Sequence, residues 1–254
     1  MAGVALCTGA ASGIGRATAV ALARRGASVV ACDVDTAGGK ETVKFLEAVG
    51  VEAEFVRADI AEPGEVDALV AAAVERFGRL DAAVNVAGTH AGLGELTADV
   101  SEEDFDTQIR VNLRGTWLCV RAELRQMAEQ GSGSIVNVSS VNGLTAASRG
   151  VGYSIAKHGI LGLTRTAAVE YAERGIRVNA LCPGLVDTPL TARALEIGGA
   201  DPEAALESVL AEIPLGRMAT SEEIGECAAW LCLDAAPYLT GATITVDGGF
   251  TVRG

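Results

Sequence analysis

The stretch TGAASGIG, Thr8 to Gly15, decides the fold of this chain. It follows the apolar run VALC and precedes RATAVALARRG, in which apolar residues recur at helical spacing. This order predicts a strand, a tight turn and a helix. Gly9, Gly13 and Gly15 let the backbone turn sharply or approach a pyrophosphate, and the N-terminus of the following helix presents free N–H groups. The stretch therefore predicts a dinucleotide-binding turn, although glycine also serves ordinary turns.

Seven short apolar runs are spread along the chain, with helical patterns between most of them. They lie at residues 4–7, 29–32, 53–56, 82–86, 135–139, 178–182 and 243–246. Alternation of strand and helix is typical of a doubly wound, Rossmann-type parallel sheet with helices on both faces. We expect a seven-stranded sheet in one domain that spans residues 1–254. Two further helices are expected near residues 102–129 and 153–172.

The stretch YSIAK places Tyr153 and Lys157 four residues apart, thirteen residues after Ser140. Residues at this spacing share one face of a helix, so the Lys157 ammonium can reach the Tyr153 hydroxyl. A cation at about 4 Å is expected to lower the pKa of the phenol and to make it a proton shuttle near neutral pH. Ser140 could hydrogen-bond a substrate oxygen beside it. The alternative is a surface tyrosine and a solvated lysine.

The next expected strand ends at Asp33, eighteen residues after Gly15, where a Rossmann unit places a carboxylate for the adenosine ribose. A carboxylate accepts hydrogen bonds from the ribose hydroxyls but repels a 2′-phosphate, and no basic residue follows at positions 34–37. These residues favour NAD over NADP. The alternative is that Asp33 caps the helix beginning near Thr36.

With these motifs, the chain resembles the short-chain dehydrogenase/reductase family over essentially its whole length. The segment NVAG, Asn85 to Gly88, is similar to the family's motif after the fourth strand, although Val86 stands where many members have a second asparagine. Asn112, Ser140, Tyr153 and Lys157 match the catalytic set. The resemblance implies that Asn112 helps to hold a water that carries protons from Lys157 to solvent. A helix-capping or helix-bending asparagine is the alternative.

The resemblance also implies a set of cofactor contacts. Asp59 would contact the adenine amino group beside Ile60, and Val186 and Thr188, within PGLVDTP, would fix the nicotinamide carboxamide. Helix capping by Asp59 and a rigid turn at the prolines are the alternatives. The expected cofactor-binding residues are Gly9, Ser12, Gly13, Ile14, Gly15, Asp33, Asp59, Ile60, Asn85, Ala87, Gly88, Tyr153, Lys157, Pro183, Val186 and Thr188.

Charge and composition restrict the kinds of partner that we expect this chain to bind. The formal net charge of −13 opposes binding to nucleic acid or to an anionic membrane surface. No apolar stretch approaches a membrane span and the N-terminus leads directly into a strand, so we expect a cytoplasmic protein. The two histidines and six cysteines show no ligand spacing, and no metal is expected. His90 is interpreted as a solvated loop residue in preference to a substrate contact.

These observations predict an NAD-dependent oxidoreductase that interconverts a secondary alcohol and a ketone, with Tyr153 as the acid and base. Residues 185–216 are expected to form a substrate loop or lid over a largely apolar pocket, and substrate identity stays open. The resemblance implies a homotetramer formed through the two long helices. The alternatives are an NADPH-dependent 3-oxoacyl thioester reductase and, with less support, a non-catalytic protein that senses NAD or acts as a scaffold.

Overall fold

The computed structural model describes residues 3–197 and 202–253, and within them one parallel sheet of seven strands forms. The strands run in the order β3-β2-β1-β4-β5-β6-β7, which confirms the predicted Rossmann-type sheet. Their bounds are β1 (Val4–Thr8), β2 (Ser28–Asp33), β3 (Ala53–Arg57), β4 (Ala82–Asn85), β5 (Gly133–Val138), β6 (Ile176–Pro183) and β7 (Thr243–Val246).

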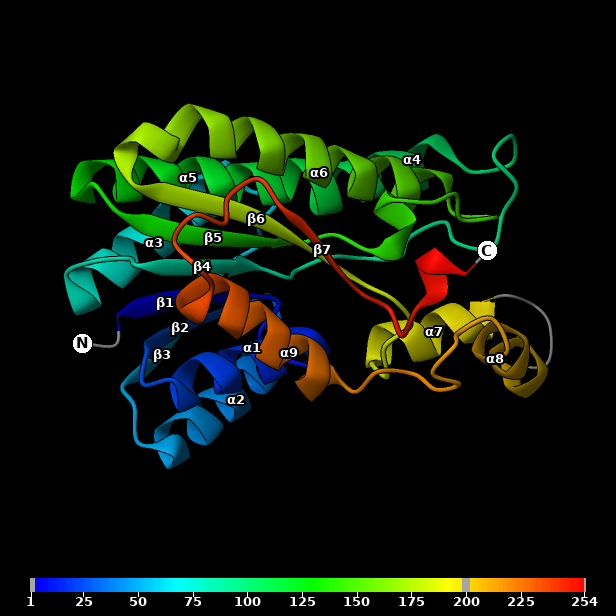
Figure 1. Cartoon of the computed structure of the whole chain (residues 1–254), viewed down its shortest axis with the longest axis horizontal. Coiled ribbons are helices and arrows are strands. Elements are labelled where there is room, and N and C mark those ends of the chain that lie inside the picture. Colours follow the sequence, from blue (N-terminus) through cyan, green and yellow to red (C-terminus); the bar gives the residue numbers. More distant parts are fainter. Residues whose placement is uncertain (1–2, 198–201, 254) are drawn as a thin grey trace.

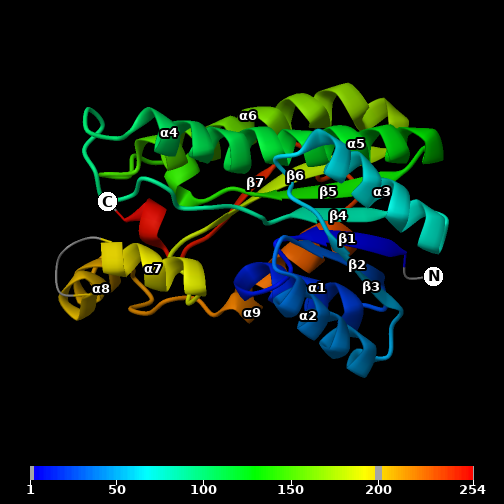
Figure 2. The ribbon, with the colours of Figure 1, turned by 180° about the vertical axis from the view of Figure 1, so that it is seen from behind.

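Helices cover both faces of the sheet (Figure 1). One face carries α1 (Gly13–Arg24), α2 (Thr36–Val49) and α9 (Ser221–Ala229). The other carries α3 (Pro63–Phe77), α5 (Thr116–Gln130) and α6 (Val151–Tyr171), as the reverse view in Figure 2 also shows. Two short helices, α7 (Pro189–Ile197) and α8 (Pro202–Leu210), lie beyond the end toward which the strands run. Residues 198–201 of the expected lid lie outside the described residues.

The strand side chains alternate between two apolar layers. In β1, Ala5 and Cys7 face the layer that includes residues of α1 and α9, whereas Leu6 faces the layer under α3 and α5. All three side chains are fully buried. Because both faces are covered, the central strands read as continuous apolar runs, which is why the sequence pattern locates them.

One expected helix differs from the prediction. The segment expected as a single helix over 102–129 consists of α4 (Glu102–Gln108), a π-helical turn η1 (Ile109–Gly115) and α5. Asn112 lies in this π-helical turn, and its carbonyl accepts a hydrogen bond of 2.8 Å from the Thr116 hydroxyl. A π-helical turn keeps the chain helical, so helical spacing on both sides predicts one continuous helix and does not mark this turn.

The order of the strands determines where the cofactor crevice lies. From β1 the sheet extends one way to β2 and β3 and the other way to β4 and β5, so the chain reverses its direction of winding between β1 and β4. In such sheets ligands bind beyond the carboxyl ends of the strands at this switch point. The glycine turn follows β1 and the NVAG segment follows β4, so the fold brings both motifs to that edge.

Candidate active site

The glycine turn is shaped by close backbone contacts. Gly9 has φ +70°, and a Cβ there would lie 2.9 Å from the backbone of Ala87. A Cβ on Gly15 would lie 1.9 Å from the carbonyl oxygen of Gly9. Helix α1 therefore starts directly against the turn, and its free N–H groups face the crevice where a phosphate can bind.

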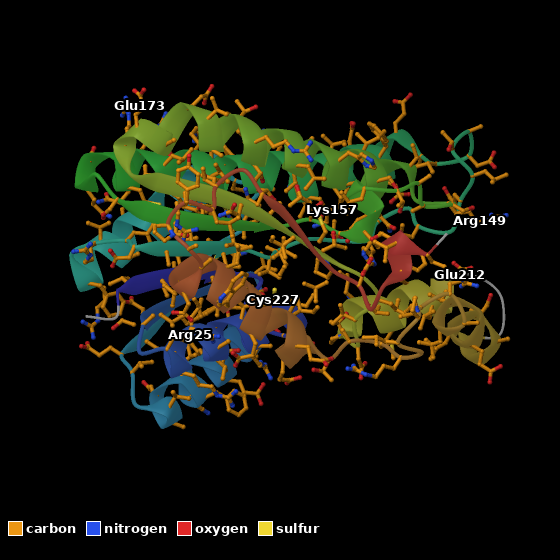
Figure 3. The ribbon with its side chains drawn as sticks, in the orientation of Figure 1. Arg25, Arg149, Lys157, Glu173, Glu212 and Cys227 are labelled. Carbon is orange, nitrogen blue, oxygen red and sulfur yellow. The ribbon has the colours of Figure 1, made fainter. Side chains whose placement is uncertain are left out.

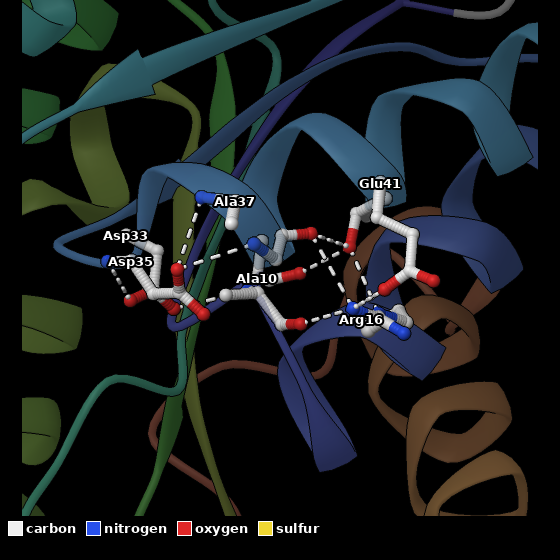
Figure 4. Close-up of polar contacts among 9 residues, drawn as sticks. Ala10, Arg16, Asp33, Asp35, Ala37 and Glu41 are labelled. Atoms are coloured by element: carbon white, nitrogen blue, oxygen red, sulfur yellow. Dashed lines mark hydrogen bonds and ion pairs between the residues drawn. The ribbon is translucent and has the colours of Figure 1, made fainter.

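Arg16 supports this turn from the outside, a role that the sequence analysis missed (Figure 4). Its guanidinium donates to the Ala11 carbonyl, and its Nε donates to the Thr42 hydroxyl at 3.0 Å. The Thr42 hydroxyl in turn donates to the Ala10 carbonyl at 2.7 Å, and Glu41 forms an ion pair with Arg16 at 2.7 Å. Arg16 of α1 and Thr42 of α2 thus each hold one carbonyl of the turn. Only the position of Arg16 directly after Gly15 could have suggested this.

Asp33 lies at the carboxyl end of β2, beside the turn (Figure 4). Its Oδ2 accepts a hydrogen bond from the Ala11 N–H at 3.0 Å, and its Oδ1 accepts one from the Asp35 N–H at 3.0 Å. The cap of α2 is Asp35, whose side chain accepts from the Ala37 and Gly38 N–H groups. The alternative reading of Asp33 as the helix cap is therefore wrong. Its carboxylate is held at the edge of the crevice instead.

The turns after β1 and β4 are joined by another group that the sequence analysis did not single out. The Thr8 hydroxyl accepts hydrogen bonds from the N–H groups of Val86 at 3.1 Å and Ala87 at 3.3 Å. The Asn85 side chain points into the core, where its amide donates to Glu123 and Asn137. Any contact from Asn85 to a cofactor is therefore left to its backbone.

Asn112 fixes the loop after β4. Its side chain is fully buried, its Oδ1 accepts from the Thr89 N–H at 2.7 Å, and its Nδ2 donates to the Thr89 carbonyl at 2.9 Å. Its amide also donates to the Gln108 side chain. A Cβ on Gly88 would lie 2.7 Å from the Asn112 Oδ1. The π-helical turn thus places an asparagine tightly against the residues that follow NVAG.

Ser140, Tyr153 and Lys157 come together at the carboxyl end of β5. The Ser140 side chain lies next to the Tyr153 phenol, and the Lys157 Nζ lies 5.5 Å from the centroid of the tyrosine ring. Lys157 is 4 % exposed and donates to the Val138 carbonyl at 2.9 Å. Figure 3 shows Lys157 on the side of α6 that faces the sheet. The surface-tyrosine and solvated-lysine alternative is therefore wrong.

The expected lowering of the phenol pKa does not occur in this structure. Burial raises the pKa of Tyr153 to about 12, and the neighbouring Ser140 side chain opposes this rise only in part. Burial likewise lowers the pKa of Lys157 to about 8. The sequence-based expectation counted the charge of Lys157 before any subtraction for desolvation, and desolvation is the larger effect here.

His90 is packed against Tyr153 and is not a solvated loop residue. Its ring meets the Tyr153 ring edge to face, with centroids 4.7 Å apart at 89°. Burial and the nearby Lys157 lower the pKa of His90 to about 4, while the neighbouring Leu190 backbone opposes this shift. Within the described chain its Nδ1 is buried and has no hydrogen-bond partner. A neutral imidazole thus connects Tyr153 with α7.

The PGLVDTP segment reaches the glycine turn. A Cβ on Gly13 would lie 3.3 Å from the Thr188 side chain, so the two segments are in contact. Pro183 ends β6, and Val186 is buried. The Thr188 hydroxyl accepts from the Thr191 N–H at 3.1 Å at the start of α7. If the Thr188 hydroxyl also binds the nicotinamide carboxamide, it has to do so while it keeps this hydrogen bond at the start of α7.

Asp59 and Ile60 follow β3 on the far side of the crevice. The Asp59 Oδ1 accepts from the Ala61 N–H at 2.9 Å, and the Asp59 N–H donates to Glu65 at 2.8 Å. Ile60 is buried, and a Cβ on Gly115 would lie 2.9 Å from its side chain. The structure therefore brings most expected contacts to one edge of the sheet.

The crevice fits a nicotinamide dinucleotide. A carboxylate held at the end of β2, glycines where backbone meets backbone, and the start of α1 occupy the positions that such a cofactor requires. Across residues 3–197 and 202–253, no three side chains gather that could hold a metal ion. No helix of the described chain is long and apolar enough to cross a membrane.

Comparison with known proteins agrees with this site. A family model described as enoyl-(acyl carrier protein) reductase matches residues 9–251. Cis-4-hydroxycyclohexanecarboxylate dehydrogenase of Sinomonas cyclohexanicum is 43% identical over 251 residues, which cover 98% of this chain and 96% of that protein.

Two solved structures have the same fold throughout. The crystal structure of levodione reductase has a TM-score of 0.96 at 36% identity and covers 99% of this chain and 98% of that one. A variant of actinorhodin polyketide ketoreductase with NADPH has a TM-score of 0.92 at 37% identity, covering 97% and 96%. The chain therefore belongs to the short-chain dehydrogenase/reductase family of oxidoreductases.

Proposed function

We propose that this protein is an NAD-dependent dehydrogenase that interconverts a cyclic secondary alcohol and the corresponding ketone. The observation that carries this proposal is that Ser140 and the Tyr153 phenol come together beside the buried Lys157. Two hydroxyl groups that converge at one point can hold a single substrate oxygen. A cation next to them stabilises negative charge that develops on the phenol.

The residues divide the work as follows. When bound, the nicotinamide supplies the hydride acceptor or donor. Tyr153 exchanges a proton with the substrate oxygen, and Ser140 holds that oxygen in place. Lys157 favours the ionised phenol, and Asn112 holds the loop at Thr89 against the site. A water held near Asn112 is part of this proposal as the route by which protons leave.

NAD is the proposed cofactor because the Asp33 carboxylate faces the position of the adenosine ribose and would repel a 2′-phosphate. The test is parallel titration of the purified protein with NADH and NADPH, followed by cofactor fluorescence. We expect NADH to bind at least about tenfold more tightly, a difference of about 1.4 kcal/mol. Preference for NADPH would refute the role of Asp33.

The second candidate is an NADPH-dependent 3-oxoacyl thioester reductase. It is favoured by the NADPH in the solved ketoreductase structure and by the description of the matching family model. An acetoacetyl thioester with NADPH is the substrate pair that distinguishes it from the alcohol dehydrogenase.

A six-membered ring is the proposed core of the substrate. One relative is named for a hydroxycyclohexane carboxylate, and another, 43% identical, is named 2,5-dichloro-2,5-cyclohexadiene-1,4-diol dehydrogenase. His90 and the apolar start of α7 flank Tyr153 and suit a compact ring with few charges. Oxidation of cyclohexanol and cyclohexanediols with NAD, read as NADH absorbance, tests this class. No turnover of any ring alcohol or ring ketone would refute it.

Tyr153→Phe distinguishes an enzyme from a non-catalytic NAD sensor. We expect this variant to lose turnover by at least about a hundredfold, because proton transfer by a positioned group contributes on this order. NADH binding should persist, since the ring and its packing against His90 remain. Full activity of Tyr153→Phe would overturn the mechanism.

We also propose a homotetramer that forms through the outer faces of α5 and α6. These helices leave large apolar side chains exposed, namely Trp117, Ile155 and Val169, the last with 81% of its surface accessible. Light scattering after size exclusion measures the mass directly, and a monomer would contradict this proposal. Location in the cytoplasm stays a prediction.

A further inference from the structure

A buried carboxyl group lies behind the active site, and the proposed reaction does not use it. Glu123 projects from α5 into the core and is fully buried. Its Oε2 accepts a hydrogen bond of 3.0 Å from the Asn85 Nδ2. Buried carboxyl groups need either a cation or a full set of hydrogen bonds. No ion pair within the described chain involves Glu123, so hydrogen bonds must satisfy it.

This contact begins a chain of hydrogen bonds through the elements that carry the site. The Asn85 Nδ2 also donates to the Asn137 Oδ1 at 3.0 Å, and the Asn137 Nδ2 donates to the Thr164 hydroxyl at 3.0 Å. Asn85 and Asn137 are directly paired across β4 and β5. Three residues after Asn137 comes Ser140, and Thr164 lies on the helix that carries Tyr153 and Lys157.

Two atoms of this chain lack partners among the described residues, and one proton would satisfy both. They are the Glu123 Oε1 and the Asn85 Oδ1, both buried acceptors. Both hydrogens of the Asn85 amide are already donated, so Asn85 can only accept. A proton on the Glu123 Oε1 would be the missing donor. A carboxylic acid and an amide would then form a planar pair with two hydrogen bonds.

We infer that Glu123 is held as a neutral carboxylic acid that donates to Asn85, and that it thereby positions the ends of β4 and β5 at the cofactor crevice. If Glu123 were ionised, neither its Oε1 nor the Asn85 Oδ1 would have a donor among the described residues, and this unfavourable burial would favour movement of Asn85. Since Asn85 begins the NVAG segment, such movement would reach the crevice. Glu123 is a positioning residue, and it touches neither substrate nor cofactor.

The surroundings of Glu123 agree with a neutral acid. Burial raises its pKa to about 7, and the hydrogen bond from Asn85 opposes this rise only in part. The titratable groups that face it are the thiols of Cys119, one turn earlier on α5, and Cys232 from η4 (Trp230–Asp234). Burial raises the pKa of both thiols, so neither supplies charge near neutral pH. At alkaline pH Glu123 should therefore ionise, and the ends of β4 and β5 should then be held less firmly at the crevice.

The test compares the wild type with Glu123→Gln, whose amide imitates the protonated acid because it both donates and accepts. Glu129→Gln, at an exposed position of the same helix, is the matched control. The dissociation constant for NADH is measured from about pH 5.5 to pH 9. We expect the wild-type constant to rise about fivefold more than that of Glu123→Gln, with the control following the wild type. Parallel profiles for the wild type and Glu123→Gln would overturn the inference.

The NADH readout rests on the proposed function. Two further measurements do not depend on that function. An infrared pH titration should show the carbonyl band of a neutral buried acid at about pH 6 in the wild type and the control, but not in Glu123→Gln. The gap in melting temperature between Glu123→Gln and the wild type should widen from about pH 4.5 to pH 7, since the folded carboxyl keeps its proton while the unfolded one ionises. Absence of both effects would refute the neutral acid, even if neither NADH nor NADPH binds.

Discussion

Replacing Lys157 with methionine should stabilise the protein while it abolishes turnover. Lys157 is 4 % exposed, and burial lowers its pKa from 10.5 to about 8. The difference, 10.5 − 8, is about 2.5 units, and at 1.36 kcal/mol per unit a protonated Lys157 costs the fold about 3 kcal/mol below pH 8. Loss of the 2.9 Å hydrogen bond to the Val138 carbonyl removes about 1 kcal/mol. The net gain at neutral pH is therefore about 2 kcal/mol.

The pH dependence of this gain follows from the direction of the shift. Between about pH 8 and pH 10.5 the unfolded chain binds the lysine proton and the folded protein does not, so the wild-type free energy of unfolding rises with pH in this window. Methionine does not titrate, so this position adds no pH dependence to the free energy of unfolding of Lys157→Met. The advantage of Lys157→Met should therefore be largest below about pH 8 and should shrink toward pH 10.5.

Thermal unfolding of the wild type and Lys157→Met at about pH 7 and pH 10 measures both effects. Lys44→Met is the matched control, because Lys44 is exposed on α2. For a chain of this size we expect a rise in melting temperature of about 4–8 °C at neutral pH. The reasoning is refuted if Lys157→Met is less stable than the wild type at neutral pH, or if the gap does not narrow at high pH.

Three other substitutions test the architecture of the site. Gly15→Ala should weaken NADH binding by about a hundredfold or more, because its Cβ would lie 1.9 Å from the Gly9 carbonyl oxygen; unchanged affinity would contradict the close packing of turn and helix. Asn112→Ala should lower the free energy of unfolding by roughly 2 kcal/mol, since it leaves the N–H and carbonyl of Thr89 unpaired, and denaturant melts measure this loss. His90→Phe keeps an aromatic ring beside the tyrosine, so NADH affinity should hold while kcat/KM for ring alcohols falls; unchanged kcat/KM would exclude His90 from the substrate pocket.

The outline of the fold could be predicted because it depends on local patterns. Strands buried on both faces require unbroken apolar runs, and crossover helices between them require helical spacing. Gly9 and Gly15 mark the cofactor turn because no other residue fits between backbones that approach so closely. Tyr153 and Lys157 could be paired because their spacing is fixed by one helix.

The sequence could not show the effects of burial or of contacts between distant segments. Desolvation raises the phenol pKa that the spacing alone predicted to fall, because an exposed and a buried tyrosine read identically in a sequence. His90 looks like a loop residue until the fold places it against Tyr153.

The sequence by itself determined which groups this chain carries: a glycine turn, a carboxylate at the end of the second strand and a tyrosine with a lysine one helical turn away. Tertiary structure alone decided how these groups are tuned. Glu123 reads as one more charged residue on a helix, yet it lies in the core against Asn85, thirty-eight positions earlier in the chain. Short-range spacing follows from the geometry of a single helix or turn, whereas burial and hydrogen bonding across strands exist only once the whole chain has packed.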